Sequence, residues 1–149
     1  MKQKATRKTL SRSAAATLVI AGILVPATAG SAHAESAKNY VCKASSSASS
    51  TDPGGRNVIA TSRDKTNSTR FFRIEFISDG EHMYATNSSL FSSINYKAYF
   101  QGTGKEWRWT LGSGKGVHDN LDLPEGHSVS VNASPSVGFV DCGTNGGKT

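Results

Sequence analysis

Hydrophobic and polar residues alternate most clearly between positions 71 and 77. The apolar residues Phe72, Ile74 and Phe76 are separated by charged ones, and the run is followed by Ser-Asp-Gly-Glu at 78–81. An Asp-Gly pair between two alternating runs is typical of a two-residue β-hairpin turn. We therefore expect an antiparallel hairpin whose apolar side chains face the core and whose polar side chains face outward.

The position of this turn also predicts which residues face one another across the hairpin. Counting back from Asp-Gly puts Phe76 opposite Met83 on the core side and Glu75 opposite Tyr84 on the outer side. A slip of one residue would turn every apolar side chain toward solvent, so the hydrophobic pattern supports this register.

A second hairpin is expected to join residues 94–100 to 106–111 through a Gly-containing loop around Thr103. If Phe100 pairs with Trp107, the small side chain of Ala98 lies opposite the large one of Trp109. The complementary side-chain volumes favour this register. Trp107 and Trp109 are predicted as core residues, and a stacking platform for a sugar or an aromatic ligand is the alternative.

Further short strands are expected at 40–44, 56–62, 117–123, 129–133 and 137–142, with Gly-, Pro- and Ser-rich turns between them. Eight or nine short strands at this spacing are typical of an all-β fold. We predict a β-sandwich, with an up-and-down β-barrel as the alternative.

The first 34 residues have the composition of a secretory signal peptide. Basic residues open the chain, an apolar run occupies 14–25, and Ala32-His33-Ala34 forms a small-x-small cleavage pattern. The apolar run is shorter than a bilayer of roughly 30 Å requires, so we expect cleavage after Ala34 and no membrane insertion of the processed protein. The long basic start and Ala-rich core resemble signal peptides of high-GC Gram-positive bacteria.

The remaining segment, 35–149, is expected to be a single secreted, extracellular and monomeric β domain, with 143–149 as a flexible tail.

Removal of the predicted signal peptide changes the net charge of the protein. The whole chain has 17 Lys and Arg residues against 11 Asp and Glu, a formal charge of +6, but five of the basic residues lie before position 35. The predicted mature domain keeps 12 basic and 11 acidic residues, so its charge is about +1. The composition therefore argues against a nucleic-acid partner.

The chain has two cysteines, Cys42 and Cys142, near opposite ends of the predicted domain. In an oxidising compartment such a pair is expected to form one structural disulfide.

The chemistry-bearing residues do not match a known catalytic or cofactor motif. There is no Gly-x-Ser-x-Gly, and neither Gly-Lys segment has the spacing of a phosphate-binding loop. His118, Asp119 and His127 form the one polar cluster suited to acid–base or metal chemistry, although their spacing matches no zinc motif and favours a polar loop. We predict no metal and no cofactor.

The outer faces of the two hairpins combine aromatic and cationic side chains that suit recognition of a polar or anionic ligand or of a protein surface. The predicted ligand-binding residues are Arg73, Tyr84, Lys97, Tyr99 and Arg108. The sequence thus favours a non-catalytic binding or effector module over an enzyme, with a glycan, a small molecule or a protein as the extracellular ligand. The alternatives are a small hydrolase using His118, Asp119 and His127, and an inhibitor or toxin-like protein presenting a rigid loop at 45–55 or 101–105.

Overall fold

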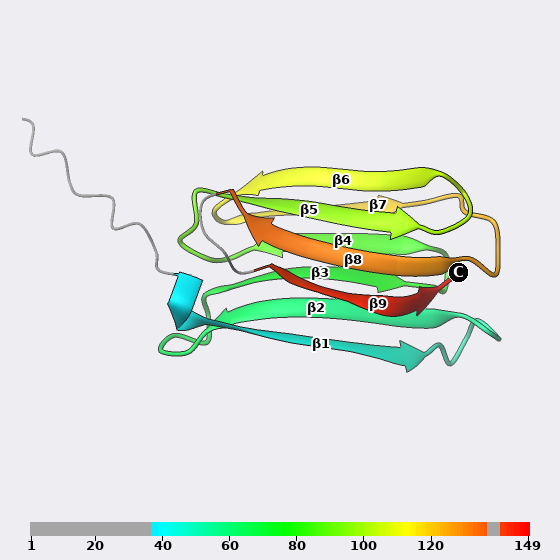
Figure 1. Ribbon diagram of the computed structural model, residues 1–149, viewed down its shortest axis with the longest axis horizontal. Coiled ribbons are helices and arrows are strands. Elements are labelled where there is room, and N and C mark those ends of the chain that lie inside the picture. The colour runs from blue at the N-terminus through cyan, green and yellow to red at the C-terminus, as the bar shows by residue number, and fades with distance from the viewer. Residues whose placement is uncertain (1–36, 137–140) are drawn as a thin grey trace, which may run out of the picture. The chain divides into compact units, whose positions relative to one another are not determined.

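Nine β-strands follow one short 3-10 helix in a computed structural model that describes residues 37–136 and 141–149 (Figure 1). The predicted signal peptide, 1–34, lies outside the described residues. The elements are η1 (Ala37–Asn39), β1 (Tyr40–Ala48), β2 (Arg56–Asp64), β3 (Phe71–Ile77), β4 (His82–Asn87), β5 (Ser93–Phe100), β6 (Lys105–Gly112), β7 (Lys115–Asn120), β8 (Ser128–Pro135) and β9 (Cys142–Lys148). Within this part of the chain, no helix is long and apolar enough to cross a membrane.

The strands form one sheet in the order β6-β5-β8-β9-β2-β3-β4-β7, with β1 paired to β2 outside this path. All the strand pairs are antiparallel. In Figure 1, β5, β6, β8 and β9 lie in front of β3, β4 and β7. The fold is therefore all-β, as the sequence predicts, and its sheet is nearly closed and barrel-like.

The β3–β4 hairpin has the predicted register. Phe76 pairs with Met83 and Glu75 with Tyr84. Gly80 takes a positive φ of 71°, a conformation that glycine adopts without steric cost, and the Glu81 amide donates to the Ser78 carbonyl at 3.2 Å. The Asp-Gly signal thus indicated both the hairpin and its pairing.

The β5–β6 hairpin differs from its predicted register by two residues. Ala98 pairs with Trp107, and Phe100 pairs with Lys105 rather than with Trp107. The turn at 101–104 is shorter than expected because Gly102 and Gly104 both take positive φ. Since side chains alternate with a period of two, the error moves each partner along the strand without changing which face it occupies.

The core is filled by the inward side chains of both halves of the sheet. Phe72, Ile74 and Phe76 of β3 are completely buried, and the ring of Phe76 lies edge-on to Phe100 of β5 at a centroid distance of 6.0 Å. Burial of each such ring contributes about 2–3 kcal/mol, so these contacts hold the front and back strands together.

The predicted flexible tail at 143–149 is wrong. Residues Cys142–Lys148 form β9, which pairs with β8, and Thr149 is 2% exposed. A β-carbon on Gly147 would lie 2.8 Å from Val58 Cγ1 and 2.9 Å from Val129 Cβ. The strand has no large apolar side chain because its bare backbone packs against the core. The first part of the strand predicted at 137–142 lies outside the described residues.

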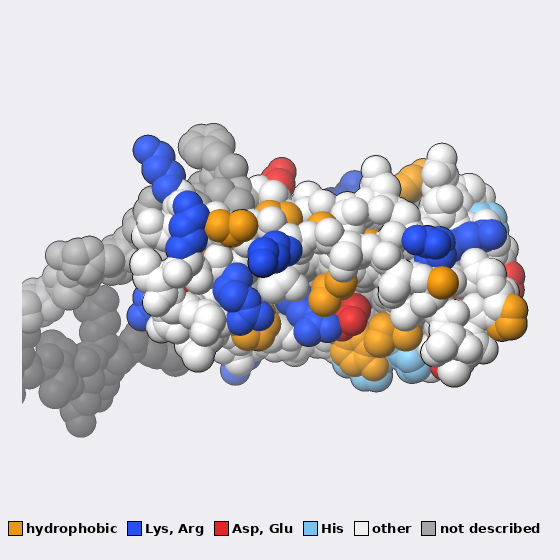
Figure 2. Space-filling view, turned by 90° about the horizontal axis from the view of Figure 1, so that it is seen from below, with side chains coloured by type: hydrophobic (Ala, Val, Ile, Leu, Met, Phe, Trp, Pro, Cys, Tyr) orange, Lys and Arg blue, Asp and Glu red, His pale blue; other side chains and the backbone are white. Residues whose placement is uncertain are grey.

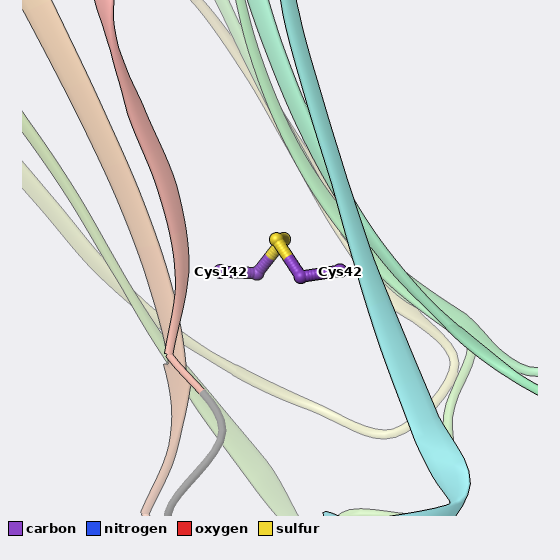
Figure 3. Close-up of a disulfide and its surroundings, with 2 residues drawn as sticks. All are labelled: Cys42 and Cys142. Atoms are coloured by element: carbon purple, nitrogen blue, oxygen red, sulfur yellow. A yellow bond between two sulfur atoms is a disulfide. The ribbon is translucent and has the colours of Figure 1, made fainter.

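The predicted disulfide between Cys42 and Cys142 is present and joins β1 to β9, with 5.3 Å between the two Cα atoms (Figure 3). β9 meets β2 through a single backbone pair, Arg56 with Lys148. On this side of the barrel, β9 is joined to β2 by this backbone pair and by a hydrogen bond from Arg56 Nε to the Gly146 carbonyl, and to β1 by the disulfide.

Candidate functional site

The outward side chains of β6, β5, β8 and β9 form an open surface that we call the polar face. Three of the five predicted ligand-binding residues lie here: Lys97 and Tyr99 on β5, and Arg108 on β6. Because strand side chains alternate, the same outer side carries Asn132 of β8 and Asn145 of β9.

Three charged side chains are fixed against one another on the polar face. The carboxylate of Glu106 binds Lys97 Nζ at 2.8 Å through one oxygen and Arg108 Nε through the other. The hydrogen bonds from Arg108 and Lys97 lower the pKa of Glu106 to about 2. The carboxylate thus stays ionised at pH values where an ordinary glutamate begins to take up a proton, and the three side chains keep their arrangement.

Tyr99 stands beside this charged group with 41% of its surface exposed. A shallow hollow of about 610 Å³ lies next to its ring and is also lined by Lys97, Ser130, Asn132 and Asn145. An exposed aromatic ring is thereby surrounded by amide, hydroxyl and charged groups that both donate and accept hydrogen bonds.

The other two predicted binding residues lie on the far side of the barrel. Arg73 of β3 forms an ion pair with Glu75, and Tyr84 of β4 stacks flat on His118 of β7, with ring centroids 4.2 Å apart and planes 3° from parallel. The structure therefore divides the predicted five-residue set between two opposite faces.

A hollow of about 970 Å³ lies over β1 and β2 and is lined by Lys43, Arg63, Lys65 and Arg73 together with apolar Val41 and Ile59. Figure 2 shows Lys and Arg side chains gathered around hydrophobic ones on this side. The arginines have partners of their own: Arg63 donates to the Ser68 carbonyl and lies 5.0 Å from the centre of the Phe71 ring, and Arg73 binds Glu75. Of these contacts, the ion pair with Glu75 offsets the positive charge of Arg73.

Where the two ends of the sheet path meet, side chains replace strand pairing. The indole nitrogens of Trp107 and Trp109 on β6 both donate to Asp119 Oδ2 on β7, at 2.6 Å and 2.9 Å. We call this line the β6–β7 seam, and no backbone ladder joins these two strands in the described part of the chain. Trp107 is 7% exposed and belongs to the core, as predicted, whereas Trp109 is 41% exposed at the seam. The ring planes differ by 55°, so the two indoles do not form a flat stacking platform.

Asp119→Ala is expected to lower the free energy of unfolding by about 1–3 kcal/mol, because the indole N–H of buried Trp107 loses its acceptor. Urea denaturation followed by tryptophan fluorescence measures the change. Asp122→Ala is the matched control, since it removes the same charge from an exposed position shortly after β7 and is expected to cost less than about 0.5 kcal/mol. Equal losses in the two variants would contradict this role of Asp119.

The alternative polar cluster is spread over three separate places. Asp119 binds the two tryptophans at the seam, and His118, the adjacent residue of β7, faces the opposite side and contacts His82. His127 precedes β8, and its Nδ1 lies 2.9 Å from the Gln101 carbonyl. The structure does not bring His118, Asp119 and His127 toward a common reacting atom.

The loops expected for an inhibitor are short. Residues 45–48 belong to β1, and the remainder of the 45–55 segment turns back on itself through a bond from the Ser49 amide to the Gly55 carbonyl. Thr51 on this segment donates to Asp79 beside the β3–β4 turn at 2.7 Å. Residues 101–104 form the tight turn of the β5–β6 hairpin, and Lys105 already belongs to β6.

Glu106, Asn132 and Asn145 are the members of the polar face that sequence reasoning missed. The alternation of Val129, Val131 and Ala133 already implied an outward Asn132. Asn145 had no such signal, because its strand lacks an apolar pattern.

Comparison of the chain with protein-family models, curated proteins and solved structures finds no significant match. The functional interpretation therefore depends on the chemistry of these surfaces.

Proposed function

We propose that this protein is a secreted, non-catalytic binding domain that recognises an extracellular glycan through its polar face. The observation that carries the proposal is the exposed ring of Tyr99 beside the fixed Lys97–Glu106–Arg108 group. A sugar presents an apolar C–H face that packs on an aromatic ring, and hydroxyls that donate and accept hydrogen bonds at once. The polar face offers both kinds of partner on one rigid sheet.

The shape of the face favours a glycan over a small apolar molecule. Pockets for small apolar ligands enclose most of the ligand with hydrophobic walls. The polar face is open, and the side chains beside Tyr99 are amides, hydroxyls and charged groups. An extended chain of sugars can lie along such a surface and contact several of these groups together.

The spacing of carboxylates supports binding without hydrolysis. Glycoside hydrolases use two carboxyl groups that flank the scissile bond about 5–9.5 Å apart. The polar face has Glu106 on β6 and Asp141 just before β9, and these strands are three places apart in the sheet order. At about 4.8 Å per strand their backbones are about 14 Å apart across the sheet. Asn145 is the β9 residue level with Glu106, and Asp141 lies four residues, about 13 Å, from it along the strand, so the two carboxyl groups are too far apart for that chemistry.

The proposal includes export by the signal peptide predicted at 1–34 and action as a monomer outside a bacterial cell. For the architecture, we propose that the barrel-like sheet is a β-sandwich. The disulfide is compatible with an extracellular setting, because such bonds persist in oxidising compartments.

Tyr99→Ala is expected to weaken glycan binding about tenfold, since loss of the stacking ring removes on the order of 1.4 kcal/mol. Co-sedimentation of the purified protein with insoluble peptidoglycan, chitin and cellulose measures the bound fraction. Tyr84→Ala, the same change on the opposite side of the barrel, is the matched control and is expected to bind like the unaltered protein. Failure of the protein to sediment with any of the three polysaccharides, or equal binding by the two variants, would reject the proposal.

A further inference from the structure

Two histidines 36 residues apart in sequence meet on the outer side of β4 and β7. Tyr84 is paired with His118 and His82 with Asn120, so the two histidines are diagonal neighbours on one face. Their rings approach through His82 Nδ1 and His118 Nε2, which lie 3.1 Å apart. Two imidazole nitrogens thus face each other at the protein surface.

The geometry of this pair fits a shared metal ion. Two nitrogens 3.1 Å apart, each about 2.05 Å from a metal, enclose an angle of about 98° at the ion, between the square-planar and tetrahedral values. The ring centroids would then be about 4.8 Å apart for the usual imidazole dimensions. The centroids of His82 and His118 lie 5.0 Å apart. The observed separation is thus within about 0.2 Å of the chelate value, and rotation of the two rings would direct both nitrogens to one ion.

We propose that His82 Nδ1 and His118 Nε2 bind one late divalent transition-metal ion, of the class of Cu²⁺, Ni²⁺ and Zn²⁺, with water completing its coordination. Imidazole nitrogen suits these ions and not Ca²⁺ or Mg²⁺. In the metal-free pair, one of the two facing nitrogens carries the hydrogen-bonding proton. When the metal binds, that proton moves through solvent to the other nitrogen of the same ring, so both rings remain neutral ligands.

Neighbouring groups hold the two rings in place. Tyr84 stacks on His118 with nearly parallel planes, which restricts rotation of that imidazole. A β-carbon added to Gly80 would come within 3.0 Å of His82 Nε2, so the far edge of the His82 ring lies over a glycine and its Nδ1 edge faces His118. Restricting both rings before binding lowers the entropy lost when the ion is bound.

The two histidines are the protein ligands of the proposed site. Among the described residues, no group of three or more His, Cys, Asp or Glu side chains is placed to hold a metal, so the chain supplies two ligands here.

Titration of the full chain with CuCl₂, followed by the electron paramagnetic resonance of the bound copper, tests the site. We expect hyperfine structure from two imidazole nitrogens, and at least a tenfold loss of affinity in both His82→Gln and His118→Gln. His127→Gln is the matched control, since this histidine lies at a different place and contacts Gln101, and it is expected to bind copper like the unaltered chain. The double variant His82→Gln/His118→Gln is expected to bind more weakly than either single one, but by less than the product of the two single losses, because one remaining imidazole binds copper without the chelate.

Competition with ZnCl₂ and CaCl₂ extends the test to the ion class. Zinc is expected to displace copper at higher concentration, and calcium is expected to have no effect. Equal copper affinity in the unaltered chain, His82→Gln and His118→Gln would overturn the proposal, as would an equal loss in His127→Gln. The site lies on the opposite side of the barrel from the polar face, so either result leaves the proposed glycan binding to be judged by its own experiment.

Discussion

Replacing Cys42 and Cys142 together with alanine is expected to lower the free energy of unfolding by roughly 4–5 kcal/mol. The disulfide closes a loop of 100 residues, nearly the whole described domain, and therefore removes a large part of the conformational entropy of the unfolded chain. It also closes one side of the barrel, where β9 and β2 share a single backbone pair. Urea denaturation monitored by circular dichroism gives the free energy of unfolding of both proteins.

Reduction of the unaltered protein is the control for the cysteine variant. Both treatments break the same cross-link, so their free energies of unfolding are expected to agree within about 1 kcal/mol, while the denaturant dependence steepens because the open chain exposes more surface when unfolded. A loss below about 1 kcal/mol in both would show that the cross-link has little influence on the stability of the sheet.

Phe76→Ala is expected to cost about 3–5 kcal/mol, the second largest effect that the structure predicts. Phe76 is completely buried on β3 between the neighbouring strand residues Val58 and Met83, and its ring lies edge-on to Phe100 of β5. Removal of the ring leaves a cavity where the front and back strands meet. Thermal and urea unfolding measure the loss.

Phe76→Leu separates the effect of the cavity from that of the aromatic contact. Leucine refills most of the volume, so this variant is expected to lose less than about 1.5 kcal/mol. If alanine and leucine at position 76 destabilised the protein equally, the edge-on contact with Phe100, and not the filling of space, would be the dominant interaction.

Local signals were sufficient for the strands whose partners are close in sequence. The Asp-Gly turn after Phe76 predicted the hairpin and its register, because the turn geometry and the hydrophobic alternation agree. The second hairpin was placed with the correct faces but two residues out of register. The complementary side-chain volumes of Ala98 and Trp109 suggested one register, but the tight turn that Gly102 and Gly104 allow determines the observed one.

Local sequence patterns do not predict the interactions between strands that are distant in the chain. The sequence predicts a tail at 143–149 because this segment has no apolar pattern, yet the absence of a side chain at Gly147 lets the backbone of β9 approach Val58 and Val129. The contact of His82 with His118 depends on the pairing of β4 with β7, which no local sequence motif predicts. The split of the predicted binding residues between two faces has the same origin, since their distribution depends on how the hairpins are folded over one another.

The β6–β7 seam and the disulfide give the two sides of the barrel opposite mechanical properties. One side is locked by a covalent bond, while the other is held by side-chain hydrogen bonds, among them the two that Asp119 receives from the indoles and one from Asn87 Nδ2 of β4 to the Leu111 carbonyl of β6. Parting β6 from β7 breaks hydrogen bonds donated by side chains, whereas separating strands within a ladder breaks a row of backbone hydrogen bonds. The domain thus has no backbone ladder along this flank, and we expect local opening of the barrel to begin there.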